Sequence, residues 1–205
     1  LFFVYMISTN HGRTSMLTLL LTGIAVSSFL SACTSLLISF SNAGVMLQIV
    51  QWLMGDLNGR AWGHVQILLI PVLVSICLFL YYANDLDIFL LGEEQAQNMG
   101  ISVQRTRNIL LIVASLVTGS SVALTGAIGF VGLIVPHMIR MIIGPTHRYL
   151  LLASALGGAT FLIVADLISR LVIRPAEIQI GIITAFFGAP FFIYLILKNK
   201  KKGDV

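Results

Sequence analysis

Long apolar stretches separated by short polar segments dominate the pattern along this chain. A stretch of about 18 or more apolar residues predicts a helix that can cross a membrane core ~30 Å thick. Five such stretches are present, at 16–40, 65–82, 107–127, 149–172 and 181–198. A sixth apolar segment, 133–143, is so short that it covers only about half of such a core. Residues 1–8 have the pattern of the end of a truncated helix.

Segment 126–140 is dense in glycine and carries Pro136 and His137 near its end. Three glycines in it, Gly126, Gly129 and Gly132, predict close approach of helix backbones, as packed membrane helices require. A proline and a histidine at membrane depth predict an irregular segment that is shielded from lipid by protein. Broken elements of this kind are typical of proteins that move something across a bilayer.

The composition supports an integral membrane protein. Hydrophobic residues make up 58% of the 205 residues and charged residues only 10%, whereas soluble domains carry about 25% charged residues. The net charge of +4 comes from basic residues scattered at helix ends, which is not a pattern for nucleic-acid binding. We therefore expect one all-α domain over 1–205, a polytopic bundle of membrane helices. The chain starts with Leu and lacks a charged leader, so we expect a fragment of a larger protein.

The distribution of positive charge predicts the orientation. If 133–143 crosses the membrane and 1–8 ends another span, nine basic residues lie on one side. The other three, Arg60, Arg170 and Arg174, lie on the opposite side. Basic residues favour the cytoplasmic side, so this arrangement predicts about six spans plus a truncated N-terminal one, with a cytoplasmic C-terminus. If 133–143 did not cross, the Lys-rich tail and the loop 84–106 would lie on opposite faces.

Two of the polar connections contain patterns of their own. Segment 42–57 is amphipathic, and Trp52 and Trp62 flank residues 55–60, which predicts a short helix at the external membrane surface. The loop 85–107 contains a short predicted helix that starts at Glu93 and Glu94 and ends at Gly100. This loop is either a solvated linker or a docking surface for a cytoplasmic partner.

Polar groups inside the predicted spans are few. Asp166 and Arg170 are four residues apart, so they share a helix face near the external end of a span. They form either a structural ion pair or a functional site. The first full helix carries small and hydroxyl residues at helical spacing, which predict close helix packing: Thr22, Gly23, Ser27 and Ser31.

Several chemistries find no support in the sequence. No P-loop, HExxH or GxSxG motif is present, so we expect neither an enzyme nor an ATP-binding subunit. The four histidines are far apart in the sequence and have no metal-ligand spacing. Cys33 and Cys77 lie within apolar spans and are expected to be small buried apolar groups. We therefore expect no metal and no cofactor bound by this chain.

Five motifs, taken in order, resemble those of the FecCD family of ABC-transporter permeases, which import iron-siderophores, haem and cobalamin. They are the segments LGEEQAQNMG at 91–100, GAIGFVGLIVPH at 126–137, HR at 147–148, ADLISR at 165–170 and GAPFF at 188–192. The resemblance covers essentially the whole chain. It departs from the family at Glu177-Ile178-Gln179, where Glu-Leu-Pro is usual, near Leu152, where a proline is usual, and at Thr146, where Asp is usual.

The resemblance implies an architecture and residue roles. Family members have ten membrane helices, so this chain would hold the end of the fourth through the tenth. Loop 83–106 would contact the ATPase subunits through Gly92, Glu93, Glu94, Ala96 and Gly100. Arg170 would meet acidic residues of a periplasmic binding protein, and Arg60 and Arg174 would join it by side and charge. The helix that carries Thr22, Gly23, Ser27 and Ser31 would line the translocation pathway, while Asp166 and the glycines with Pro136 would be structural.

The resemblance also implies partners. The chain would work as a homodimer or paired permease in the plasma (inner) membrane, with two cytoplasmic ATPase subunits that hold ATP and Mg²⁺. A periplasmic or lipoprotein binding protein would deliver an iron chelate, haem or a corrinoid. The alternative is an ion-coupled secondary transporter, which predicts a charged pair at the bilayer midplane. Asp166 instead lies towards one end of its span. A structural membrane scaffold would leave the segment 126–137 unexplained.

Overall fold

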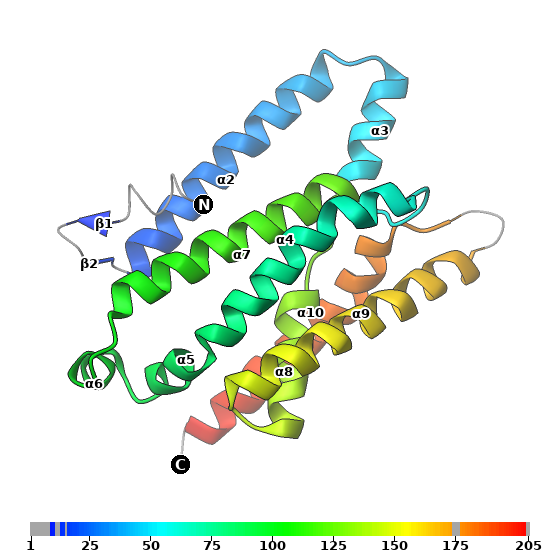
Figure 1. The fold of residues 1–205 in the computed structure, drawn as a ribbon. Coiled ribbons are helices and arrows are strands. Elements are labelled where there is room, and N and C mark those ends of the chain that lie inside the picture. Colours follow the sequence, from blue (N-terminus) through cyan, green and yellow to red (C-terminus); the bar gives the residue numbers. More distant parts are fainter. Residues whose placement is uncertain (1–8, 11–12, 15, 174–176, 204–205) are drawn as a thin grey trace.

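The computed structural model describes residues 9–10, 13–14, 16–173 and 177–203 (Figure 1). Apart from a ribbon of two-residue strands, β1 (Thr9–Asn10) and β2 (Arg13–Thr14), the described chain is helical, as predicted. The helices are α2 (Met16–Ser39), α3 (Ala43–Leu53), α4 (Trp62–Tyr81), α5 (Ala83–Phe89), α6 (Glu93–Asn98), α7 (Val103–Thr125), α8 (Val131–Ile143), α9 (His147–Leu171) and α10 (Ile180–Gly203).

Four of the five long predicted spans are helices long and apolar enough to cross a membrane: Leu20–Ser39, Trp62–Tyr81, Val103–Thr125 and His147–Leu171. The fifth is also a helix, α10, but its apolar part, Ile180–Leu195, is shorter than these four. Helix α7 begins four residues before the predicted span, because its first turn is polar and stands outside the apolar stretch. Sequence patterns find the apolar part of a helix better than its ends.

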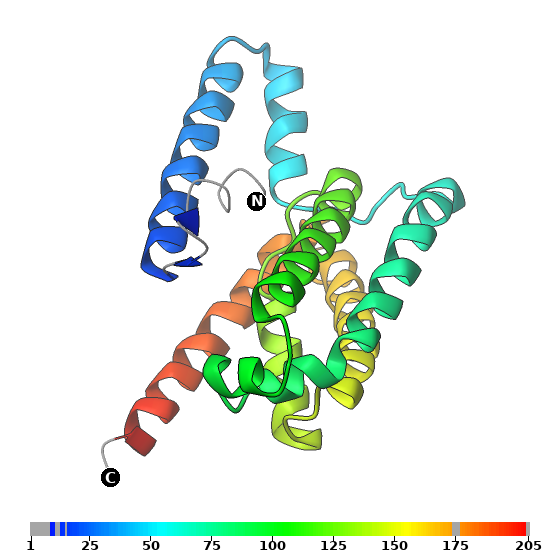
Figure 2. The same cartoon turned by 60° about the vertical axis from the view of Figure 1, so that its left-hand side comes forward.

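The helices form a bundle with an appended hairpin. Helix α9 lies at the centre of the bundle, where it packs against α8, α10, α4 and α5, while α4 also packs against α7. A small core of Ala165, Ile180 and Ile183 joins α9 to α10. Helices α2 and α3 form a hairpin beside the bundle, and α2 stands apart from the other long helices in both views (Figures 1 and 2).

The predicted irregular segment is confined to the stretch between α7 and α8. Gly126 ends α7 with a φ of 72°, and Phe130 precedes α8 in the left-handed region at φ 66°. The expectation that Pro136 and His137 are irregular was wrong, because both lie inside α8. A proline removes one backbone N–H from a helix, and α8 continues through it while packed along α9.

Backbones approach most closely at what we call the glycine crossing, formed by Gly55, Gly126 and Gly181. Here the chain leaving α3 passes between the end of α7 and the start of α10. The Asp56 N–H donates to the Thr125 carbonyl at 2.8 Å, and the Gly181 N–H donates to the Met54 carbonyl at 3.1 Å. These two bonds tie the α3–α4 connection to both helices.

Side chains have no room at the glycine crossing. A Cβ at Gly126 would lie 2.1 Å from the Trp52 carbonyl oxygen, and one at Gly181 would lie 2.0 Å from that of Met54. The prediction of close packing is therefore confirmed at Gly126. It is wrong for Gly129 and Gly132 within the described chain, because a Cβ at either would meet nothing within 4 Å.

Candidate functional site

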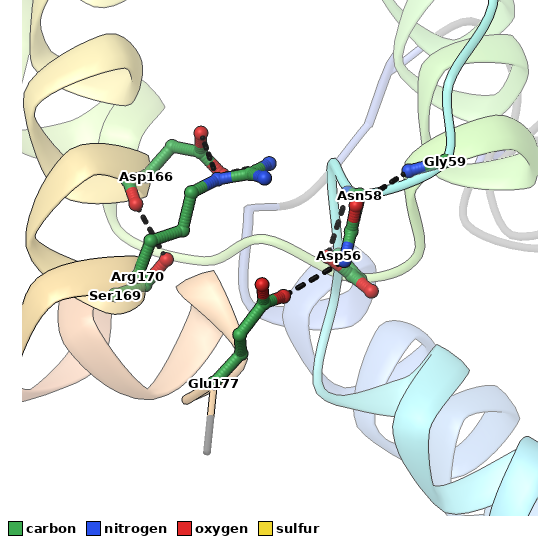
Figure 3. A network of polar contacts seen from close by, with 7 residues as sticks. All are labelled: Asp56, Asn58, Gly59, Asp166, Ser169, Arg170 and Glu177. Carbon is green, nitrogen blue, oxygen red and sulfur yellow. Dashed lines mark hydrogen bonds and ion pairs between the residues drawn. The ribbon is translucent and has the colours of Figure 1, made fainter. Parts of the chain in front are cut away.

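Polar side chains gather at two opposite ends of the bundle. The first group surrounds Arg170 at the C-terminal end of α9 (Figure 3). Its guanidinium donates to both carboxylate oxygens of Asp166, from Nε to Oδ2 at 2.8 Å and from Nη2 to Oδ1 at 3.1 Å. This confirms that the two side chains share one face of the helix. The ion pair is half-buried, so part of its charge remains accessible.

We call the space around this ion pair the arginine hollow. Besides Asp166 and Arg170, it is lined by Asp56, Ser169, Glu177, Ile178 and Gln179. Asn58 bridges its acidic side, since its backbone N–H donates to Asp56 and its side-chain amide donates to Glu177, both at 2.7 Å. Three carboxylates thus surround one guanidinium, and the hollow is suited to recognising a charged or hydrogen-bonding surface.

The three arginines predicted to share a docking face have different positions. Arg170 lies in the hollow and is already paired with Asp166. Arg60 is exposed in the loop that follows Asn58. Arg174 lies outside the described residues. The sequence interpretation missed the contribution of Asp56 and Glu177, which come from two distant loops. A signal for Glu177 was available, since it belongs to the segment where a family motif was found altered.

The second polar group lies at the other end of the bundle, around the short helices α5 and α6. The predicted short helix is confirmed as α6, which starts at Glu93 and is followed by Gly100. Gly92 and Gly100 flank it with φ of 110° and 86°, angles that glycine adopts at little cost. Ala96 is fully buried at 0% exposure, so it anchors α6 to the bundle instead of facing outwards.

The two acids at the start of α6 differ in their surroundings. Glu93 forms an ion pair with Arg107 of α7. Among the described contacts no hydrogen bond or ion pair involves Glu94, and its side chain is exposed. Asp85 of α5 accepts a hydrogen bond from the Thr106 hydroxyl at 3.2 Å. Of the predicted coupling residues, Glu94 is therefore the carboxylate that is available to a partner.

Asp87 connects this end of the bundle to α9. Its Oδ1 accepts from the backbone N–H of His147 at 2.8 Å and lies 2.7 Å from the Nδ1 of the same residue. Burial tends to raise the pKa of Asp87, but the backbone hydrogen bond, the ring contact and the charge of His147 lower it below its ordinary value. The folded protein thus favours the charged carboxylate.

This lowered pKa predicts a pH-dependent stability. The folded pKa is below the unfolded value of about 3.9, so the contribution of Asp87 is fully present above about pH 4 and is lost as the pH falls through the folded pKa. We expect Asp87→Asn to lower the melting temperature in detergent at pH 7. The difference from wild type should shrink as the pH is lowered below about 4. A difference that stays constant down to acidic pH would contradict this assignment.

The residues predicted to line a pathway lie on α2. Thr22 and Gly23 are half-buried, and Ser27 and Ser31 are exposed. The main neighbour of α2 within the described chain is α3, and a Cβ at Gly23 would meet nothing within 4 Å. The close packing predicted for this helix is thus not seen within the described residues, and its role in a pathway stays a prediction.

A metal site is not built from the described side chains, because no group of three or more His, Cys, Asp or Glu could hold an ion there. The free thiols Cys33 and Cys77 were expected to be buried and are instead exposed. Both lie on apolar helices whose outer faces would meet lipid or further helices.

Comparison with known proteins identifies a family. The FecCD transport family matches residues 1–198. The chain is 47% identical to the cobalamin import permease BtuC of Halobacterium salinarum, over 95% of this chain and 52% of that protein. It is 37% identical to the hemin transport permease HmuU of Yersinia pestis, over 95% and 58%. It is 40% identical to the Fe(3+) dicitrate permease FecD of Escherichia coli, over 89% and 57%.

A solved structure has the same fold. It is described as an inward-facing conformation of a metal-chelate type ABC transporter. It matches with a TM-score of 0.84 and 34% identity, over 90% of this chain and 60% of that chain. The present chain thus spans about half the length of the curated relatives it matches.

Proposed function

Because this chain belongs to the FecCD transport family, we propose that it forms part of the transmembrane permease of an ATP-driven importer in the plasma (inner) membrane. The observation that carries this proposal is the family match over residues 1–198 together with the shared fold. The permease would work in pairs with two cytoplasmic ATPase subunits, which would hold ATP and Mg²⁺. A periplasmic or lipoprotein binding protein would deliver the substrate.

The proposed topology has six spans plus the end of another, with the C-terminus in the cytoplasm. The residue Thr125, before α8, contacts Asp56, and His147, after α8, contacts Asp87. Asp56 lies before the start of α4 and Asp87 lies after its end, so these two contacts are at opposite ends of α4. The chain therefore passes from one end of the bundle to the other through α8, which supports a crossing by this helix despite its length. The distribution of basic residues supports this orientation, because Lys and Arg favour the cytoplasmic side. Arg105, Arg107 and Arg148 lie at the end of the bundle that carries α5 and α6, whereas Arg60 and Arg170 lie at the end that carries the arginine hollow.

In this topology α5 and α6 are cytoplasmic and would contact the ATPase. Helix α6 is six residues long and is fixed by buried Ala96 and by the Glu93–Arg107 pair. A short helix fixed in this way can transmit a displacement imposed by a partner to the rest of the bundle as a rigid body. Exposed Glu94 would provide a charged contact at this interface, with Gly92 and Gly100 setting the orientation of the helix.

The arginine hollow would face the binding protein. Arg170 retains accessible surface beside Asp166. Arg60, which follows Asp56 by four residues in the sequence, is exposed. We propose that acidic groups of the binding protein compete with Asp166 for Arg170. Because the hollow also holds Asp56 and Glu177, the docking partner would need hydrogen-bond donors beside its acids.

The substrate would be a bulky metal chelate, haem or a corrinoid, since the named relatives carry cobalamin, hemin and Fe(3+) dicitrate. An ion-coupled secondary transporter is the alternative. It would use a charged pair at the bilayer midplane, whereas Asp166 and Arg170 lie near the end of α9.

The proposal is tested by co-purifying the full-length permease with its candidate ATPase. We expect Glu94→Arg to weaken association at least roughly tenfold, because it reverses an exposed interfacial charge. Glu94→Gln is the matched control, since it removes the charge at the same position without reversing it. It should weaken association far less.

Uptake into vesicles is the second measurement. Import of a chelate that requires ATP and the binding protein supports the importer. Failure of wild type to bind any ATPase, with uptake that follows an ion gradient without ATP, would replace the importer with the secondary transporter.

A further inference from the structure

The start of α9 is capped by a residue from another helix. His147 is the first residue of α9, and Thr146 before it makes no side-chain capping bond. The Asp87 carboxylate of α5 instead accepts the His147 N–H at 2.8 Å and contacts its ring at 2.7 Å. A carboxylate at a helix N-terminus is favourable for both hydrogen bonding and the helix dipole. The orientation of α9 is therefore fixed against α5 at this point.

Packing among the apolar side chains of α4, α5, α7 and α9 is incomplete. An open hollow of about 390 Å³ is lined by Arg107 and by apolar side chains of these four helices, among them Phe79, Leu86, Phe89, Leu110 and Leu151. Side chains that border a void lose contacts on that side. The polar link is better shielded, since the His147 side chain is only 13% exposed. Among the described residues, the Asp87–His147 pair is the polar contact that joins α5 to α9.

Two further polar contacts join α5 and α6 to α7. Asp85 contacts Thr106 at 3.2 Å, and Glu93 pairs with Arg107. Helix α7 also follows α6 directly in the chain, after only a short connection, so a displacement of α6 is transmitted to α7 through the covalent backbone. Helix α9 has no such connection and can follow only through tertiary contacts.

Helix α9 leads from Asp87 to the arginine hollow. It is continuous over 25 residues, which corresponds to about 37 Å, and it carries Asp166 and Arg170 at its far end. We propose that Asp87 and His147 are a positioning pair that makes α9 move with α5 and α6. A displacement of the loop would then reach the arginine hollow along α9. This inference rests on the proposed function, because it assigns the route by which ATPase motion reaches the binding protein.

The test measures substrate taken up per ATP hydrolysed in the complete transporter in proteoliposomes. We expect Asp87→Ala to lower this ratio roughly tenfold, within the usual range of coupling energies, while ATP hydrolysis continues. Asp87→Asn should recover part of the ratio, because its amide oxygen can still accept the His147 N–H. Asp85→Asn is the matched control, since it removes a carboxylate of the same helix but leaves an acceptor for Thr106. It should keep the wild-type ratio.

The outcomes separate the two proposals. A wild-type complex without ATP-dependent uptake defeats the proposed function itself. If wild type transports but Asp87→Ala lowers hydrolysis and uptake in the same proportion, or leaves both unchanged, the pair is only structural or irrelevant and the inference is overturned. Should Asp87→Ala fail to assemble, Asp87→Asn decides alone: a ratio equal to wild type at reduced stability contradicts the proposal, and a reduced ratio supports it.

Discussion

Replacing Gly126 by alanine is expected to destabilise the folded chain by about 3–5 kcal/mol, the sum of backbone strain and overpacking. Gly126 adopts φ 72° and ψ −175°, a combination that is essentially restricted to glycine. Its new Cβ would also lie 2.1 Å from the Trp52 carbonyl oxygen. That atom belongs to the backbone and cannot rotate away. Thermal unfolding of the purified permease in detergent should show a melting temperature lower by about 10 °C.

Gly119→Ala is the matched control for this substitution. Gly119 lies in the same helix, and a Cβ there would meet nothing within 4 Å. Alanine is favoured over glycine inside a helix by about 1 kcal/mol, so this variant should be as stable as wild type or slightly more stable. Equal melting temperatures for the two variants would show that the close approach at Gly126 is relaxed at little cost.

Gly188→Ala is expected to destabilise the folded chain by about 2–3 kcal/mol through overpacking. Gly188 of α10 faces Phe130, the residue with positive φ that precedes α8. A Cβ at Gly188 would lie 2.5 Å from the Phe130 Cβ and 2.6 Å from its Cγ. The Cβ of Phe130 is fixed by its backbone, so α8 and α10 would have to separate. The measurement is again the melting temperature, together with the yield of folded protein.

A second substitution checks this explanation. Phe130→Gly removes the atoms that clash and also permits the positive φ. The double variant Gly188→Ala with Phe130→Gly should therefore be more stable than the sum of the two single effects predicts, by at least about 1 kcal/mol of coupling. Strict additivity would mean that the cost at Gly188 arises from other neighbours, such as Ile134.

The sequence predicted the elements of this fold well because apolar length and period are local properties. The four long spans, the short helix before Gly100 and the shared face of Asp166 and Arg170 all follow from spacing along one helix. The predicted helix within 42–57 is likewise confirmed as α3, capped by the Asn42 side chain. Its location at the external surface stays a prediction.

The parts that could not be predicted depend on contacts between distant segments. Gly55 and Gly181 belong to the glycine crossing, yet nothing near either residue in the sequence indicates that Trp52 and Met54 would pass beside α7 and α10. The pairing of Asp87 with His147 also joins residues 60 positions apart. Pro136 was misjudged for a related reason, since a helix-breaking residue is tolerated where a neighbouring helix supports it. Sequence spacing gives no access to such support.

The glycine crossing also sets an order on folding. The carbonyl of Met54 accepts its hydrogen bond from the N–H of Gly181, at the start of α10, which is synthesised long after α3 and α4. Until α10 has been synthesised, the segment after α3 can form only one of these two hydrogen bonds, the one from the Asp56 N–H to the Thr125 carbonyl. Closing a loop of this length is slow and costs chain entropy. The connection between α3 and α4 is therefore fixed only by a segment made after all the other described helices, so the described bundle reaches its final arrangement only once α10 has been synthesised.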